Sequence, residues 1–367
     1  MNGIVFVRHP VPHPDRPGSE MHPRRFSPLE SLWSRVFALA LTAALACIAD
    51  APALAADGIP VCVSPFDQSA PVSVPDGHGG MYLAWLDQRL GYNTDVYLQR
   101  VTPSLQRSAG WTDNGAPMTF VTCTKTEASL LSDSLGVLGV WSDNRCNAGT
   151  GFDIYVERFT PSGVRGAGWP ANGRLVFNGG GDQLHAAIAT DGAGGAFVAW
   201  TDLGVAPRRL SAHHVLANAT LDPAWPANGL ALSSTLSDSS GASLVADGAG
   251  GVYLAWQDVR TGTGDVWMQR LKADGTPAAG WSAGGAAFVT ATGNQYAPRL
   301  VSDGSGGAIA VWCDRRTGVT QLRALRVGGA GAPSCLSKAS RVFPSLGSAE
   351  PRSNPVRPAT CASPANP

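Results

Sequence analysis

The sequence is poor in charge. Only 15% of its 367 residues are Asp, Glu, Lys or Arg, lysine is scarce, and the formal net charge at pH 7 is zero. Nucleic acids and anionic membranes are bound through clustered positive charge, so we expect neither as a partner. The motifs of zinc hydrolases, nucleotide-binding loops and serine nucleophiles are also missing, and we predict no cofactor and no metal site. Composition therefore excludes several functions without naming one.

The sequence is rich in glycine and in internal repeats. Its 44 glycines suit short strands joined by tight turns better than long helices. A segment of the pattern DGxGGxxxxWxDxR occurs five times, and its tryptophans are 56, 59, 56 and 56 residues apart. A regular period takes precedence over the two or three domains that the length alone suggests. The tryptophans are Trp85, Trp141, Trp200, Trp256 and Trp312.

Each repeat contains four strand candidates. The Asp-Gly and Gly-Gly pairs supply the positive φ angles of a tight hairpin turn. The strand after this turn is apolar on both faces, as Val252 to Trp256 illustrates, so it must be covered on both sides. Four antiparallel strands per unit at this period are typical of propeller blades. We predict an all-β, five-bladed β-propeller over residues 57–327.

The ends of the array predict how the ring closes. Gly58 to Asp76 aligns with the fourth strand of a unit and the first strand of the next, whereas the last unit fades after Val327. The N-terminal segment would then add the fourth strand of the final blade. Such closure removes the exposed sheet edges that invite aggregation.

The two termini lie outside the repeat. Residues 1–56 are interpreted as a signal peptide with an overlong N-terminal extension, because arginines precede an apolar run, Val36 to Ile48, and small residues follow at Ala53 to Ala55. The run is too short to span a bilayer. We expect an exported bacterial protein, secreted or at the cell surface, without a transmembrane segment. A lipoprotein with a lipidated Cys47 is the alternative. Residues 328–367 are typical of a flexible tail.

Two resemblances add to this interpretation. The five DGxGGxxxxWxDxR segments resemble exported bacterial β-propeller repeat proteins over about residues 58–327. That resemblance implies the fold and no substrate. In the tail, Pro351 to Val356 resembles the opening of the C-terminal sorting domains of the type IX secretion system. The strands of such a domain do not follow, so either the reading frame is truncated or the likeness is accidental.

The aspartate of each repeat stands where a strand ends. Together with glutamines of neighbouring loops, these aspartates would form a polar ring at the mouth of the propeller, where a sugar or a cation binds. The third unit departs most from the pattern and adds a histidine. We assign no catalytic residue. The candidate ligand-binding residues are Gln68, Asp87, Asp143, Gln183, His185, Asp202, Asp258, Gln295 and Asp314.

The same aspartates also have a structural interpretation. In three units an arginine follows the aspartate, and a second aspartate opens the next strand. In the third unit Gly204 replaces the arginine and Arg209 replaces the second aspartate, whereas the fifth unit keeps Arg316 opposite Gln321. A linked loss predicts mutual contact, because a buried charge without its partner is costly. Scaffold ion pairs, which we favour, and a ligand ring remain open alternatives.

The third unit also carries adjacent histidines. Neighbouring strand residues point to opposite faces, so His213 and His214 cannot easily share one metal. His214 takes the position that arginine holds in the other units, which favours a structural substitution over a zinc ligand.

Six cysteines follow the signal segment, and export permits disulfides. We predict the pairs Cys123–Cys146 and Cys62–Cys335, the second of which would lock the ring, while Cys313 and Cys361 receive no partner.

The sequence thus predicts a monomeric, non-catalytic β-propeller that binds a carbohydrate or a protein partner. The alternative is a glycan-cleaving hydrolase with carboxylates at the channel mouth.

Overall fold

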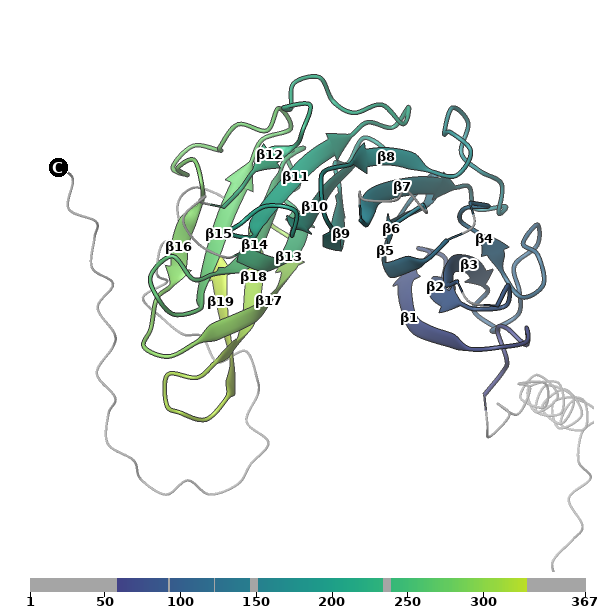
Figure 1. Cartoon of the computed structure of the whole chain (residues 1–367), viewed down its shortest axis with the longest axis horizontal. Helices are drawn as coiled ribbons and strands as arrows, with labels where there is room; N and C mark the ends of the chain where they lie inside the picture. Colours follow the sequence, from purple (N-terminus) through teal and green to yellow (C-terminus); the bar gives the residue numbers. More distant parts are fainter. Residues whose placement is uncertain (1–57, 92, 122, 146–150, 234–238, 329–367) are drawn as a thin grey trace, which may run out of the picture. The chain divides into compact units, whose positions relative to one another are not determined.

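The computed structural model describes residues 58–91, 93–121, 123–145, 151–233 and 239–328. All regular secondary structure in these residues is β-strand, arranged in five antiparallel sheets (Figure 1). From Pro60 onward the described residues belong to one compact unit. The described ranges hold no helix that is long and apolar enough to cross a membrane. The predicted signal segment and nearly all of the predicted tail lie outside the described residues and stay predictions.

Each sheet follows one sequence repeat, with its strands in chain order. The first sheet contains β1 (Gln68–Pro75), β2 (Met81–Asp87), β3 (Asp95–Val101) and β4 (Ala116–Pro117). The second contains β5 (Lys125–Asp133), β6 (Gly136–Asp143), β7 (Asp153–Phe159) and β8 (Arg174–Phe177). The third contains β9 (Gln183–Thr190), β10 (Ala196–Asp202), β11 (Arg209–Val215) and β12 (Leu230–Ala231). The fourth contains β13 (Ser239–Ala246), β14 (Val252–Asp258), β15 (Asp265–Leu271) and β16 (Ala286–Val289). The fifth contains β17 (Gln295–Ser302), β18 (Ala308–Asp314) and β19 (Gln321–Val327).

The first hairpin of a sheet is fixed by its Asp-Gly turn. In the fourth sheet the Asp247 carboxylate accepts hydrogen bonds from the backbone N–H groups of Ala249 and Gly251, each at 2.8 Å. An ideal Cβ on Gly251 would lie 2.3 Å from the carbonyl oxygen of Leu271, so only glycine allows this approach. Asp76, Asp191 and Asp303 make the same pair of bonds in their own sheets. The turn chemistry predicted from the sequence is confirmed.

Hydrophobic cores lie between successive sheets. Four clusters of buried side chains join the first sheet to the second, the second to the third, the third to the fourth and the fourth to the fifth. The middle strands are covered on both faces, as expected from their apolar sequences, and Trp141, Trp200 and Trp256 are fully buried. Four-stranded antiparallel sheets packed face to face in this way are the blades that the sequence predicts.

The first strand of each blade meets the first strand of its neighbour. The Ser132 hydroxyl donates to the carbonyl oxygen of Pro75 at 2.6 Å, and the Ser129 hydroxyl donates to that of Ala186 at 2.9 Å. In the last two sheets the Leu300 N–H donates to the Ser243 hydroxyl at 2.9 Å. We call β1, β5, β9, β13 and β17 the inner strands, because they also line one common cavity described below.

The predicted closure of the ring is wrong for the described residues. Residues 58–67, where the fourth strand of the last blade was predicted, form no strand, so the fifth sheet keeps three strands. The segment contacts its own sheet instead, where the Val63 N–H donates to Asn114 Oδ1 at 2.7 Å. No hydrophobic core of the described residues joins the fifth sheet to the first. The alignment predicted a fourth strand in a segment that forms none, and the contacts that would hold it on β19 do not form.

Candidate functional site

The five aspartates of the repeated motif are buried. Asp87, Asp143 and Asp258 have no exposed surface, and Asp314 and Asp202 expose 1% and 3%. In the fourth sheet the Asp258 carboxylate accepts bonds from Trp256 Nε1 at 3.1 Å, from the Ser239 hydroxyl at 3.0 Å and from Arg260 Nη2 at 2.6 Å. Each lone pair of such a carboxylate is engaged by the protein itself, which leaves little for a ligand.

The motif arginine pairs with the motif aspartate. The linked sequence change predicted that this arginine contacts the aspartate that opens β3. Arg89 instead contacts Asp87, at 2.6 Å. Its guanidinium lies 3.6 Å from the centre of the Tyr97 ring, a cation–π geometry. In the third sheet, which lacks this arginine, Arg209 reaches Asp202 from β11 at 3.4 Å. The linked change therefore moves the positive charge to a new position while keeping its partner.

The surroundings of the two sets of aspartates shift their pKa values in opposite directions. Burial would raise the pKa of Asp87, but hydrogen bonds from Arg89 and Trp85 more than offset it and hold the pKa below its usual value. Hydrogen bonds from Arg316 and Trp312 lower the pKa of Asp314 in the same way. At the start of β7, burial and the nearby Asp143 raise the pKa of Asp153 to about 6. Asp87 and Asp314 are thus stabilised as anions.

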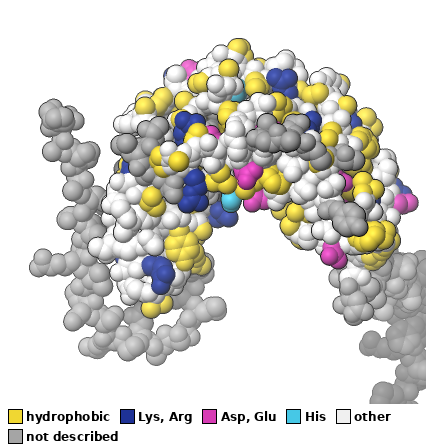
Figure 2. Space-filling model, viewed as in Figure 1, with side chains coloured by type: hydrophobic (Ala, Val, Ile, Leu, Met, Phe, Trp, Pro, Cys, Tyr) yellow, Lys and Arg dark blue, Asp and Glu magenta, His cyan; other side chains and the backbone are white. Residues whose placement is uncertain are grey.

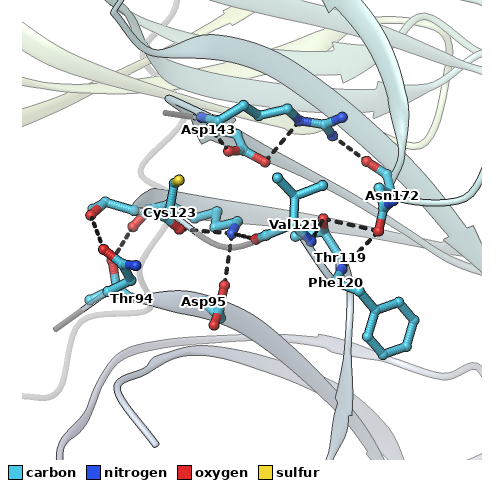
Figure 3. A network of polar contacts seen from close by, with 12 residues as sticks. Thr94, Asp95, Thr119, Phe120, Val121, Cys123, Asp143 and Asn172 are labelled. Atoms are coloured by element: carbon cyan, nitrogen blue, oxygen red, sulfur yellow. Dashed lines mark hydrogen bonds and ion pairs between the residues drawn. The ribbon is translucent and has the colours of Figure 1, made fainter. Parts of the chain in front are cut away.

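The three candidate glutamines serve the loops. Gln183 and Gln295 are fully buried, and their Nε2 atoms donate to the carbonyl oxygens of Gly181 at 3.2 Å and Gly293 at 3.0 Å. Gln68 is exposed and donates to the Phe66 carbonyl oxygen at 2.8 Å. In the second sheet this position is Lys125, which is fully buried. Its ammonium contacts Asp95 at 2.8 Å and the carbonyl oxygens of Val121 and Cys123 (Figure 3).

A bulge interrupts every inner strand at the same place. Beside the motif tryptophan of the next strand, the inner strand carries extra residues, and the pairing register shifts. One residue of each bulge has a positive φ angle, between 49° and 70°. Only one of the five is glycine, although glycine adopts this conformation at least cost. The five residues are Ala70, Glu127, His185, Gly241 and Ala297.

The inner strands line a cavity of about 470 Å³. All five strands contribute to it, and this size is within the range of small-ligand sites, roughly 300 to 1,000 Å³. Most of the lining is aliphatic or hydroxyl-bearing, and it contains three ionisable side chains, Glu127, His185 and Arg299. Figure 2 shows a histidine close to acidic and basic side chains in a hollow of the surface. Of the nine candidate residues, only His185 lines this cavity.

Glu127 and His185 are in contact across two sheets. The backbone N–H of His185 donates to Glu127 Oε2 at 2.6 Å. The Nε2 atom of the His185 ring lies 3.8 Å from Glu127 Oε1. Both side chains are about half exposed, at 49% for His185 and 41% for Glu127. Glu127 and Arg299 were not among the candidate residues predicted from the sequence. The signal for Glu127 was available, because it occupies the position of His185 in the preceding repeat.

The other two described histidines of the third sheet are structural. His214 is buried between Asp191, at 3.1 Å, and Asp222, at 2.8 Å. The arginines at its position bind the equivalent turn aspartates, as Arg270 binds Asp247 at 2.9 Å, so the predicted substitution is confirmed. Burial lowers the pKa of His213, whose ring stacks on Trp225. Among the described residues no cluster of three His, Cys, Asp or Glu side chains could hold a metal ion.

One of the predicted disulfides is contradicted. Cys62 has a free thiol, so the pair Cys62–Cys335 is wrong. Its sulfur lies 3.3 Å from Arg89 Nη2 and 3.8 Å from Asp87 Oδ2, which places it in the ion pair of the first sheet. Cys313, to which no partner was assigned, is also free. Cys123 is buried, but Cys146 lies outside the described residues, and the pair Cys123–Cys146 stays a prediction.

Comparisons with known proteins give no family for the chain. No family model matches it, and no curated protein matches it either. Among solved structures it is similar to an endo-arabinase from Bacteroides thetaiotaomicron, with 11% identity over 73% of this chain and 96% of that one, at a TM-score of 0.40. A protein of unknown function from Dyadobacter fermentans is 13% identical over 75% and 82% of the two chains, at 0.46. A putative TolB from Agrobacterium tumefaciens is 14% identical over 73% and 80%, at 0.41. Likenesses this remote indicate nothing about activity.

Proposed function

We propose that this protein is an exported, non-catalytic binding protein of the propeller type, and that its ligand occupies the cavity lined by the inner strands. The ligand is a carbohydrate or a partner protein that inserts a polar group. A cavity of about 470 Å³ with a few convergent polar side chains is suited to such a ligand.

One observation carries the choice between binding and hydrolysis. Hydrolysis of a glycosidic bond generally requires two carboxyl groups that flank the bond, as general acid and as nucleophile or base. The described lining of the cavity holds one carboxylate, Glu127, and its sequence neighbours contribute serine and aliphatic side chains. The motif aspartates are buried in ion pairs and do not line the cavity. This arrangement supports recognition of a ligand rather than its cleavage.

A glycan array and a polysaccharide hydrolysis screen on the secreted protein test the proposal. We expect retention of one class of glycan and no release of reducing ends. Turnover that disappears in Glu127→Gln would overturn the non-catalytic function, because a carboxyl group at the cavity would then be part of the chemistry.

A further inference from the structure

We propose that the cavity binds a carboxylated sugar, with Arg299 holding the carboxylate and the Glu127–His185 pair holding hydroxyl groups. This inference rests on the proposed function and names the ligand class of the same site. The cavity contains three ionisable side chains, Glu127, His185 and Arg299. None of them takes part in the ion pairs and turns that repeat in the sheets.

None of these three side chains repeats. The register of Arg299, opposite Val311, is occupied by Val72, Ala187 and Ser243 in three other sheets. Glu127 and His185 likewise stand where two other units have alanine and one has glycine. Scaffold residues such as the motif aspartates repeat in every unit, because each sheet needs the same contact. Charged residues that occur once per chain serve something that occurs once, such as a bound ligand.

Glu127 and His185 also occupy a strained backbone conformation. Their φ angles are 50° and 60°, in the left-handed region, which is costly for a residue with a side chain because its Cβ lies too close to a backbone carbonyl oxygen. The fourth unit avoids this cost with Gly241, at a φ of 70°. Strain of this kind is typical of functional positions, where a side chain is kept in spite of it.

Arg299 has no carboxylate partner among the described residues. Its guanidinium donates to the carbonyl oxygen of Pro298 at 3.0 Å. By contrast, Arg260, Arg270 and Arg316 each hold an aspartate within 3 Å. A planar guanidinium with free N–H groups at a cavity is suited to a carboxylate, which it can bind through two parallel hydrogen bonds.

The opposite charges of the cavity select the rest of the ligand. Glu127 repels ligands of dense negative charge, such as nucleic acids or multiply phosphorylated molecules. The Glu127 carboxylate already accepts a hydrogen bond from the backbone N–H of His185. It is therefore better suited to accept hydrogen bonds from ligand hydroxyl groups than to bind a free cation. The imidazole of His185 can both donate and accept. One carboxylate on a molecule rich in hydroxyl groups suits both Arg299 and the Glu127–His185 pair.

Isothermal titration of the secreted protein tests the inference with three probes. These are oligogalacturonate, sialyllactose and a neutral galacto-oligosaccharide of similar length. We expect at least one acidic probe to bind about tenfold or more tightly than the neutral one, as a charge-assisted hydrogen bond predicts. Arg299→Gln should remove that preference, and the control Arg315→Gln, which changes an exposed arginine outside the cavity, should keep it.

Glycine substitutions separate binding from folding. Glu127→Gly and His185→Gly remove the side chains and also relieve the left-handed strain, so the variants should unfold no earlier than the natural protein while binding the sugar more weakly. Ala297→Gly, at the same bulge of the fifth sheet, relieves strain without removing a polar group. It should leave affinity unchanged.

The outcomes distinguish this inference from the proposed function. Equal affinity for acidic and neutral probes, unchanged by Arg299→Gln, would overturn the acidic ligand while leaving glycan binding intact. Binding of a zwitterionic dipeptide that depends on Arg299, with no binding of any glycan, would overturn the sugar itself. Glycan binding that survives Glu127→Gly, His185→Gly and Arg299→Gln would show that the site lies elsewhere.

Discussion

Replacement of Asp258 by alanine separates the two interpretations of the repeated motif. In the structure this carboxylate is fully buried and accepts five hydrogen bonds, three of them from Arg260, at 2.6–3.1 Å. The substitution leaves Arg260 without its anion and Trp256 Nε1 without an acceptor. Removing one partner of a buried ion pair costs about 3–5 kcal/mol of unfolding free energy. The Arg260 side chain is 19% exposed and can turn toward water, so we expect the lower end, about 3 kcal/mol.

The assay is calorimetric unfolding of the protein. At about 2–4 °C per kcal/mol, the expected loss in Tm is roughly 6–12 °C. Asp202→Ala should cost less, about 1–2 kcal/mol, because Asp202 makes longer contacts, at 3.1 to 3.4 Å, and accepts nothing from the tryptophan before it. Asp113→Ala is the control, since this carboxylate is 85% exposed in its pair with Arg107. An unchanged Tm of Asp258→Ala with lost ligand binding would refute the scaffold role.

Two further predictions concern charge and backbone space. Asp153 has a folded-state pKa of about 6, above its ordinary 3.8, so the native state binds a proton more tightly than the unfolded chain. Its contribution to stability therefore falls as pH rises from about 4 to about 6, and Asp153→Asn should flatten this part of a Tm-against-pH profile; an unaltered slope would refute the assignment. Gly204→Arg would install the residue that the four other units carry, yet an ideal Cβ there lies 1.4 Å from the Gly180 carbonyl oxygen. We expect a loss of folded protein, measured by circular dichroism, whereas native-like melting would contradict the close approach.

The sequence predicted the blades because their signals are local. Adjacent residues such as Asp247 and Gly248 predict a hairpin turn, and an unbroken apolar run predicts that a middle strand is buried. The linked change at Gly204 and Arg209 correctly indicated an ion pair. It could not show which carboxylate is the partner, because the two aspartates of another unit, such as Asp258 and Asp265, face each other at one register position.

The missed features depend on backbone conformation and on contacts distant in sequence. The bulges of the inner strands were invisible, since Ala70, Glu127, His185 and Ala297 adopt the left-handed conformation without the glycine that usually signals it. Closure failed as a prediction because alignment shows that a segment resembles a strand but not whether the packing needed to hold it on a distant sheet exists.

The contrast between repeating and unique residues is the most general guide to function in this chain. Five similar sheets impose similar requirements, so the tryptophan and aspartate of the motif return in each unit, and in four units they are hydrogen-bonded to each other, as Trp85 is to Asp87 and Trp312 to Asp314. A ligand on the inner strands has no such symmetry and meets each sheet with a different part of its surface. Residues that recognise it must therefore break the repeat, and Glu127, His185 and Arg299 break it within one cavity. Motif conservation within the chain thus marks what holds the sheets, while its exceptions mark where to look for binding.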